Sequence, residues 1–403
     1  MKSVRPISAP KRHRGFSLIE LMVGVGIGLV ITLAVFQVLT ASEARKRTST
    51  GLNDASQSGN YALYVLDRML RSAGTGYSQG WATVGGCRLN AALPGGESLP
   101  RVGPLPAPFT AIPQTFRLAP VVIFRGASDT GTDVIMVMSG ATGYGEVLTN
   151  VPAGGVAATQ VALPNTIGYR AGDLVMLASG GECLLSQVDA AKPACAGDPA
   201  APLGTACGPI LPLGGTYYTP AGANLSLATL ALQSDVSAFS IGNATTNPPQ
   251  FGLIGVGADS TLFAHNLLLF NGVNASEPLA EGVRELHAVY GLDTNDDGIL
   301  DAWQSPTALW DGPALMDGSA ASNARLRQIV AVRVGLVLRS SLVERELEPG
   351  VPVAPANLQL FSDLPAPNPI TVDLTRAGEN RNQRHRTVEI TVPLRNFLMR
   401  TTS

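Results

Sequence analysis

Apolar side chains dominate the sequence between Leu18 and Leu39, where only Glu20, Thr32 and Gln37 are strongly polar. A helix rises about 1.5 Å per residue, so a run of this length would span roughly 33 Å, enough to cross the hydrocarbon core of a bilayer. The pattern therefore predicts a membrane-spanning helix that carries one carboxylate near its beginning.

Helical periodicity continues beyond the apolar run, but there it has only one apolar face. Gly74 is suited to end the helix, which we predict to run from Phe16 to Ser72. A coiled coil is the alternative use of this face, but the body that follows favours docking on a sheet. The predicted apolar stripe consists of Leu52, Ala55, Gly59, Ala62, Leu66, Met69 and Ala73.

Short apolar runs separated by Gly and Pro follow the helix and predict a β-rich body. Residues 77–116 show little periodicity and are expected to form loops, whereas the Gly-, Ala- and Pro-rich residues of about 141–260 look like insertions between strands. The segments expected to form strands or short helix–strand units are 120–126, 133–140, 159–164, 173–179, 267–272, 282–293, 329–340 and 385–397.

Composition and charge support an exported, turn-rich β protein. Charged residues make up only 14% of the 403 residues, while Gly (44) and Pro (29) are plentiful. Five Lys and Arg residues precede Phe16, so the rest of the chain carries −2 − 5 = −7 and has no basic face for nucleic acid. A basic leader stays on the cytoplasmic side of the membrane, which directs the C-terminal bulk outward.

The chain has four cysteines, Cys87, Cys183, Cys195 and Cys207, and none of them forms a C-x-x-C motif. No clustered histidines accompany them, so a zinc site is not indicated. An even number in an exported chain predicts two disulfides, for which three connectivities exist. We favour Cys195 with Cys207 and Cys87 with Cys183 over the other pairings and over free thiols.

Glu20 needs a cationic partner, because a carboxylate inside a membrane segment is costly. If the chain were cut between Gly15 and Phe16, the new α-amino group would lie one helical turn from Glu20. In a bundle of such helices, the amine of one chain could neutralise the carboxylate of a neighbour. A secretory signal cut near the Thr40–Ser42 sequence "TAS" is the rival interpretation, with a mature start near Glu43.

The segment "RGFSLIELMVGVGIGLVI" resembles the class III signal of type IV pilins and pseudopilins. The resemblance implies that a prepilin peptidase cleaves between Gly15 and Phe16 and methylates the Phe16 amine, and that Glu20 is the assembly carboxylate. It also implies a division of the chain into a leader (1–15), a transmembrane and filament-core helix (16–41), its amphipathic continuation (42–74) and a periplasmic β-rich domain (75–403).

Later segments resemble the minor pilin family called PilW. They are "GNYALYVLDRMLRSAGTGY", "GDLVMLAS", "VRELHAVYGLDTNDDGILDAW", "RQIVAVRVGLVLRS" and "HRTVEITVPLRN". The resemblance implies an α+β, pilin-like fold in which a long N-terminal helix packs on an antiparallel sheet. It further implies a low-abundance subunit at the tip or base of a pilus, which helps to start assembly with other minor pilins and the major pilin. Such a subunit resides first in the inner membrane, with its C-terminal domain in the periplasm, and then in the pilus at the cell surface.

The stretch "DTNDDGILD" has the spacing of an EF-type calcium loop. Asp293, Asn295 and Asp297 take positions 1, 3 and 5, the backbone carbonyl of Ile299 takes position 7, and Asp301 takes position 9. Position 12 is Gln rather than the bidentate Glu, and the flanks look strand-like. The sequence therefore predicts Ca²⁺ binding, with a solvated turn as the alternative; no organic cofactor is indicated.

Catalytic motifs are not recognisable in this chain. It has four histidines and no H-E-x-x-H, G-x-S-x-G or P-loop sequence. We therefore predict a structural assembly protein rather than an enzyme such as a membrane-tethered hydrolase. A minor pseudopilin of a type II secretion system and a calcium-dependent, pilus-associated adhesin remain the alternative functions.

Overall fold

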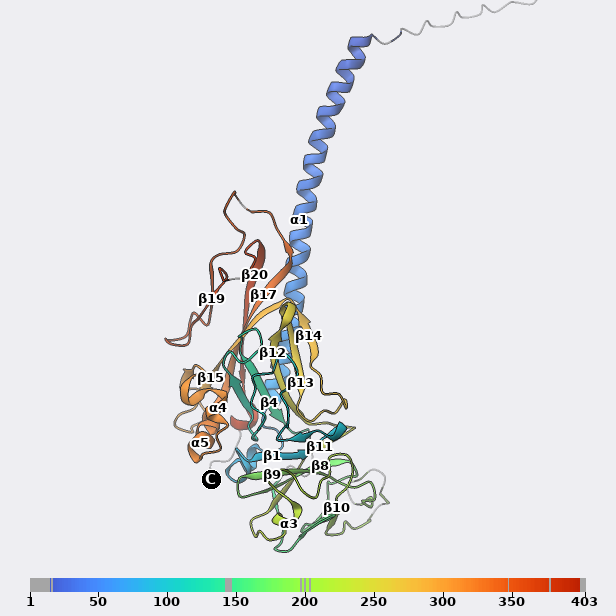
Figure 1. Ribbon diagram of the computed structural model, residues 1–403, viewed down its shortest axis with the longest axis vertical. Coiled ribbons are helices and arrows are strands. Elements are labelled where there is room, and N and C mark those ends of the chain that lie inside the picture. Colours follow the sequence, from blue (N-terminus) through green and yellow to red (C-terminus); the bar gives the residue numbers. More distant parts are fainter. Residues whose placement is uncertain are drawn as a thin grey trace, which may run out of the picture. The chain divides into compact units, whose positions relative to one another are not determined.

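A computed structural model describes residues 15, 17–141, 147–195, 198, 201–202, 204–346, 348–376 and 378–398 (Figure 1). The side chains of residues 41, 44, 45, 47–50, 52 and 398 are outside this description. The chain divides into two compact units, Met1–Asn53 and Asp54–Ser403. The predicted leader and Phe16 fall outside the described residues, apart from Gly15.

Helix α1 runs from Leu18 to Ser72 as one element of 55 residues. It begins two residues later than predicted because Ser17 caps it: the Ser17 hydroxyl accepts a hydrogen bond from the backbone N–H of Ile19 at 3.3 Å. The first unit thus consists, in its described part, of Gly15, Ser17 and this helix as far as Asn53, and most of that length is apolar. Leu18–Thr40 is long and apolar enough to cross a membrane, as the sequence pattern predicted.

The second half of α1 packs inside the body, and the predicted apolar stripe faces the core. Ala62, Leu66, Met69 and Ala73 are buried, and an added Cβ atom on Gly59 would lie 2.2 Å from the Leu338 side chain. Helix α1 and β17 are therefore in such close contact at Gly59 that any larger residue there would require the Leu338 side chain to move.

Two antiparallel sheets, here called the upper tier, pack with α1 around the main core. The five-stranded sheet has the order β14 (Glu277–Glu281), β13 (Thr261–Asn266), β12 (Gln250–Gly257), β4 (Val134–Ser139) and β3 (Val121–Phe124). The four-stranded sheet has the order β16 (Ala302–Gln304), β15 (Val283–Leu292), β17 (Ile329–Val343) and β20 (Gln383–Pro393).

Two further sheets form a lower tier, seen below the upper tier in Figure 1. The six-stranded sheet has the order β2 (Ser98–Leu99), β1 (Arg88–Ala92), β9 (Glu182–Gln187), β8 (Asp173–Ser179), β11 (Ser237–Asn243) and β5 (Thr149–Asn150). The three-stranded sheet has the order β10 (Ile210–Pro212), β7 (Gln160–Ala162) and β6 (Val156–Ala157).

The six-stranded sheet lies between two cores. Alternate residues of β8 point to opposite faces, so Met176 joins the main core, whereas Val175 and Leu177 join a second core with Leu211 and Leu227. In this sheet β1 and β9 are parallel, which departs from the purely antiparallel arrangement expected from the sequence.

A small hairpin of β18 (Asn357–Leu360) and β19 (Ile370–Asp373) covers the other face of β15 and β17. Val289, Val337 and Phe361 are buried there in a third core.

The short helices are η1 (Ser78–Gly80), α2 (Trp81–Val84), η2 (Pro94–Gly96), α3 (Leu227–Leu230), η3 (Ala258–Ser260), η4 (Ala308–Trp310), α4 (Gly312–Leu315), α5 (Ala320–Gln328) and α6 (Arg395–Leu398).

Three details of the sequence prediction were wrong. Residues 267–272 form a turn rather than a strand, with Leu269 at a φ of 53°. Residues 77–116, expected to be loops, contain the paired strand β1. The expected insertion of about 141–260 extends too far, because β12 is the central strand of the five-stranded sheet.

Candidate assembly site

The beginning of α1 combines a helix cap with an ionisable side chain. Ser17 is the N-cap residue, and Glu20 follows three positions later in the first turn. This Ser-x-x-Glu spacing is that of a capping box, in which the second side chain can turn back toward the N-cap N–H. Glu20 is exposed, as is Gly15 on the other side of the predicted cleavage position.

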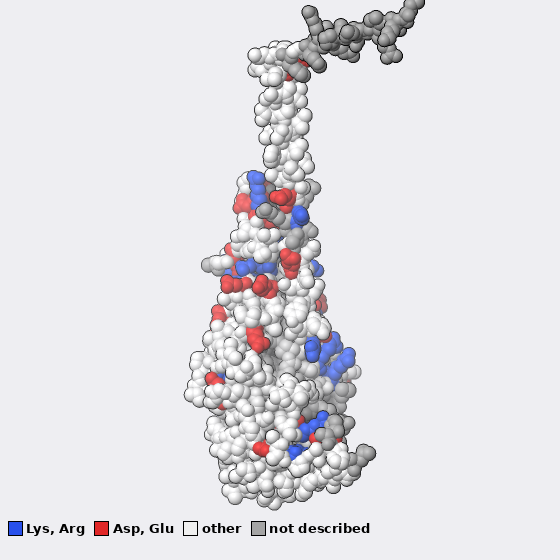
Figure 2. Space-filling view, turned by 90° about the vertical axis from the view of Figure 1, so that its right-hand side faces the viewer, with Lys and Arg blue, Asp and Glu red and all other residues white. Residues whose placement is uncertain are grey.

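The helix that follows presents an apolar surface on all sides. Every described side chain of Leu18–Thr40 is exposed, and the space around Gly24, Gly26 and Gly28 is open. In Figure 2 this length of the helix is almost free of Lys, Arg, Asp and Glu. Such a surface is not stable in water and requires lipid or other helices as its surroundings.

The C-terminal residues secure the other end of α1. The Asn396 side-chain amide donates to the backbone carbonyl of Ala73 at 3.1 Å and to the Thr75 hydroxyl at 2.8 Å. Carbonyls in the last turn of a helix have no partner within the helix, so Asn396 satisfies groups that would otherwise be unpaired. Phe397 packs beside Gly74 and lies edge-on to Trp81, with 5.1 Å between ring centroids.

Two family models match this chain. Residues 10–36 match the prokaryotic N-terminal methylation motif, which includes Gly15, Phe16 and Glu20, and residues 239–396 match the type IV pilus-assembly protein W family, PilW. The chain is a PilW-like type IV pilin. As such it is a minor pilin that takes part in pilus assembly, anchored first in the inner membrane by α1 and then incorporated into the pilus. No curated protein and no solved structure matches the chain.

The family matches cover the first half of α1, as far as residue 36, and most of the upper tier. The PilW match ends at Asn396, whose amide holds the end of α1. Residues 37–238 lie between the two matches, and they include most strands of the lower tier. Three of the segments that resemble PilW fall inside the match, whereas "GNYALYVLDRMLRSAGTGY" and "GDLVMLAS" precede it.

Both disulfides lie within the lower tier. Cys87 is paired with Cys183, and Cys195 with Cys207, which is the connectivity that the sequence analysis favoured. The first bond lies beside the parallel β1–β9 pair, where Arg88 and Glu182 also form an ion pair of 2.5 Å. Segments 96 residues apart are thereby joined next to the main core.

The predicted calcium loop is the turn of the hairpin that joins β15 to β16. Asp293 accepts hydrogen bonds from the backbone N–H groups of Asp297 at 3.2 Å and Gly298 at 2.7 Å. Asp301 accepts from the hydroxyl and N–H of Thr294, and these bonds lower the pKa of Asp301.

Gln304, which stands at position 12 of the loop, pairs with Tyr290 in the strands. Asn295, Asp297 and Ile299 are less buried than Asp293 and lie on the solvent side of the turn. Across the described part of the chain, no three His, Cys, Asp or Glu side chains are grouped as a metal site. The oxygen donors of a calcium loop are present, but Ca²⁺ binding stays a prediction.

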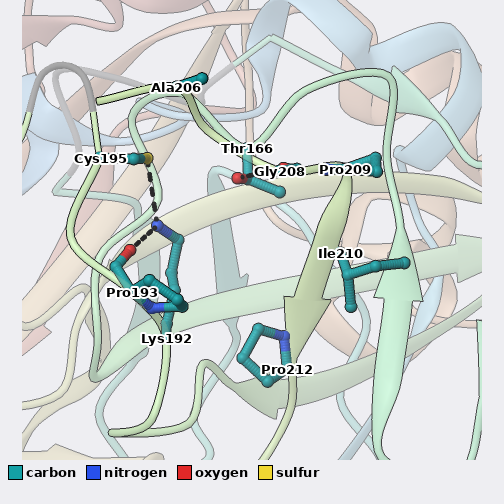
Figure 3. Close-up of a pocket in the computed structure, with 9 residues that line it drawn as sticks. All are labelled: Thr166, Lys192, Pro193, Cys195, Ala206, Gly208, Pro209, Ile210 and Pro212. Atoms are coloured by element: carbon teal, nitrogen blue, oxygen red, sulfur yellow. Dashed lines mark hydrogen bonds between the residues drawn. The ribbon is translucent and has the colours of Figure 1, made fainter. Parts of the chain in front are cut away.

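A pocket of about 350 Å³ lies beside the Cys195–Cys207 disulfide (Figure 3). Among the described residues that line it, the one cation is Lys192, whose ammonium donates to the Pro193 carbonyl at 3.2 Å and lies 3.5 Å from the Cys195 sulfur. Burial lowers the pKa of Lys192. The lining contains no carboxylate or imidazole that could act as an acid or base with it: Thr166, Lys192, Pro193, Cys195, Ala206, Gly208, Pro209, Ile210 and Pro212.

The histidines of the body connect strands. His287 lies between two carboxylates, with Nε2 2.9 Å from Glu285 and Nδ1 3.4 Å from Asp133. Asp133 also accepts the backbone N–H of Ala288 at 3.1 Å, so this group ties β15 to the start of β4. Burial lowers the pKa of His265, whose Nδ1 lies 3.2 Å from the Ala275 carbonyl. These contacts give the imidazoles a structural role, in agreement with a structural pilus component.

Proposed function

We propose that this subunit helps to start pilus assembly from one end of the filament, and that Glu20 pairs with the Phe16 amine of a neighbouring subunit. The leader would first be removed between Gly15 and Phe16 by a prepilin peptidase, which also methylates the new amine. The partners in the filament would be other minor pilins and the major pilin, all of which contact this chain through α1.

The observation that supports this proposal most directly is a lone carboxylate in the first turn of α1, within the otherwise apolar and exposed segment Leu18–Thr40. In lipid an unpaired charge costs about 3 kcal/mol on insertion scales. An ion pair between Glu20 and a cationic amine on an adjacent helix removes that cost. The pair can form only at one particular axial offset between the two helices. The pair would therefore set the register while the apolar surface supplies the contact area.

The lower tier supports a position at the end of the filament. It adds a second core beyond the C-terminal end of α1, built largely from residues that precede the PilW match. A subunit that repeats along a filament must fit between identical neighbours at every position, and each added layer restricts that fit. A subunit at the tip or base has one free side and tolerates the extra tier.

The first test is the mass of the N-terminal peptide from membrane-extracted protein. The proposal expects a start at N-methylated Phe16. A start at Met1 would mean that the leader is kept, and a start near Glu43 would mean that an ordinary secretory signal was removed; both results contradict the proposal.

Glu20 variants test the pairing itself. Glu20→Ala should insert normally but enter pili about a hundredfold less, because a neighbour's amine loses its partner at a cost of about 3 kcal/mol. Glu20→Gln keeps the capping-box geometry without the charge, and Glu20→Asp keeps the charge. If only the charge matters, Gln fails like Ala and Asp retains partial incorporation; normal incorporation of Gln contradicts the proposal.

A minor pseudopilin of a type II secretion system is the second candidate, because the N-terminal motif also resembles the class III signal of pseudopilins. The two functions differ in their readout. Deletion of a pilus subunit reduces the number of surface pili and leaves protein secretion intact. Deletion of a pseudopilin reduces protein secretion and leaves the number of surface pili unchanged.

A further inference from the structure

The outer edge of β20 is the longest unpaired strand edge among the described sheets. β20 has 11 residues and is the last strand of the four-stranded sheet. The other edge strands of the described sheets are shorter or interrupted. β2, β5 and β6 have two residues, β10 and β16 have three, β3, β18 and β19 have four, and β14 has five and contains Pro278. Proteins usually shorten or block such edges, because a free edge invites another strand.

The backbone groups on this edge can be identified from two hydrogen bonds. The N–H of Leu394 donates to Val330, and the N–H of Arg339, opposite His385, donates away from β20 to Gly282. Because hydrogen-bonded and non-bonded pairs alternate in an antiparallel ladder, every second residue of β20 turns its N–H and C=O outward. These residues are His385, Thr387, Glu389 and Thr391, and within the described residues no backbone hydrogen bond uses their outward groups.

The side chains beside this edge define what could lie against it. Val388 and Ile390 pack on the main core but stay partly exposed. Arg386 is exposed and makes one hydrogen bond of 3.1 Å to Ser56, whereas Glu389 is neutralised by Arg333 at 2.6 Å. The edge therefore offers an apolar middle and a positive charge at its start.

The direction of β20 restricts the source of an added strand. Arg386 contacts Ser56 and Asn396 contacts Ala73, so β20 runs in the same direction as the second half of α1. Subunits anchored in one membrane have helices that run the same way. Two β20 edges from co-anchored copies would therefore be parallel to each other and could pair only in a parallel ladder, which is the less stable arrangement.

We propose that the outer edge of β20 accepts an extended strand from a different, co-assembled pilin subunit, antiparallel to β20. The strand would carry apolar residues opposite Ile390 and Val388 and an acidic residue opposite Arg386, in the order apolar-x-apolar-x-acidic. Main-chain hydrogen bonds provide the affinity and alternate side chains the selectivity, as in other strand additions. This inference rests on the proposed function, because it needs partners anchored in the same membrane.

The test combines a crosslinker with a proline on the outward side of the edge. A photoreactive benzoylphenylalanine at exposed Thr391 is introduced into the full chain, in cells that assemble pili, and the crosslinked peptide is identified by mass spectrometry. Thr387→Pro removes an outward N–H and leaves the β17 ladder intact. Pro393 already occupies such an outward position in β20, so the fold tolerates the change. Thr387→Ala is the matched control.

The inference expects a crosslink to an apolar-x-apolar-x-acidic strand of another pilin, reduced about tenfold by Thr387→Pro and unchanged by Thr387→Ala. Intact disulfides and an unchanged melting temperature show that Thr387→Pro is folded. A crosslink that survives Thr387→Pro, falls equally with Thr387→Ala, or joins two copies of this chain overturns it. Failure of the proposed function gives a different result: Glu20 variants then enter pili normally, whatever the crosslink shows.

Discussion

At the scale of single residues, Glu379 is a carboxylate with a buried side chain and three arginines around it. Its side chain is fully buried and accepts a hydrogen bond from Arg284 Nε at 2.7 Å, with Arg376 at 3.4 Å and Arg339 at 3.9 Å. Burial alone would raise the pKa of Glu379, but hydrogen bonds and charge attraction from Arg284 and Arg376 outweigh it, so the pKa lies below its ordinary value.

This shift fixes the sign of a pH dependence. A carboxylate whose folded-state pKa is lowered stabilises the fold above its unfolded pKa, and the contribution is lost as the pH falls through the folded pKa. We expect Glu379→Gln to lower the free energy of unfolding by about 3 kcal/mol at neutral pH, because three arginines lose their buried partner. Urea unfolding should be measured from neutral pH down to pH values below the ordinary carboxyl range. The difference in unfolding free energy between wild type and Glu379→Gln should shrink as the pH falls.

Glu281→Gln is the control for this prediction, since Glu281 is exposed at the end of β14. It should change stability little at any pH. Equal effects of the two substitutions, or a Glu379→Gln effect that does not depend on pH, would contradict the assignment.

We also propose that the loop from Asp293 to Asp301 binds Ca²⁺ through side-chain oxygens and the Ile299 carbonyl. Added Ca²⁺ should then raise the melting temperature of the full chain, and chelation should reverse the rise. Asp293→Ala with Asp297→Ala should abolish this response. If Ca²⁺ and Mg²⁺ leave the wild-type melting temperature equally unchanged, the loop is a hydrogen-bonded turn and nothing more.

At the scale of elements, the contact between α1 and β17 depends on Gly59. A side chain there meets Leu338, which is itself buried. Replacing Gly by Leu gains about 0.8 kcal/mol of helix propensity, but overpacking a core costs about 1–3 kcal/mol. Gly59→Leu should therefore destabilise the body by up to about 2 kcal/mol in a thermal or urea unfolding experiment.

The neighbouring exposed position provides the comparison. Asn60→Leu makes a similar change on the solvent side of α1 and should be neutral or slightly stabilising. A Gly59→Leu protein as stable as Asn60→Leu would show that α1 and β17 can separate without cost at this point.

The elements that the sequence predicted well are those with regular periodicity. The stripe from Gly59 to Ala73 faces the core, and β8, β15 and β17 lie where short apolar runs indicated. Residues 267–272 failed because an apolar run buried in a turn looks the same as a buried strand. β1 was missed because it is short and pairs with β9, more than 90 residues later, which no local pattern reveals.

The candidate sites also divide into those that a local sequence pattern indicates and those that depend on contacts between distant segments. Gly15, Phe16 and Glu20 belong to one contiguous motif, so the sequence alone was enough to indicate them. The Glu379 network joins Arg284, Arg339 and Arg376, and the free edge of β20 depends on sheet order. Both features arise from contacts between distant segments and could only be found in the folded chain.

At the scale of the whole molecule, the two units have opposite requirements. The first presents an apolar helix that needs lipid or neighbouring helices, whereas the second buries its own cores and carries the charged residues of its tiers. The second half of α1 belongs to the second unit, since its apolar stripe completes the main core. Folding of the body and assembly of the filament are therefore served by different halves of one helix.

This division predicts the behaviour of a chain that begins at Asp54. It keeps Ala62, Leu66 and Leu70 in the core and removes the apolar segment, so it should be soluble without detergent and unfold cooperatively. Its melting temperature should lie within about 3 °C of the detergent-extracted full chain, a difference of roughly 1 kcal/mol. A chain that begins at Ala73 removes the docked helix as well and should fail to fold. If the chain from Asp54 aggregates while retaining both disulfides, then the first half of α1 stabilises the body, and the separation of roles within the helix is wrong.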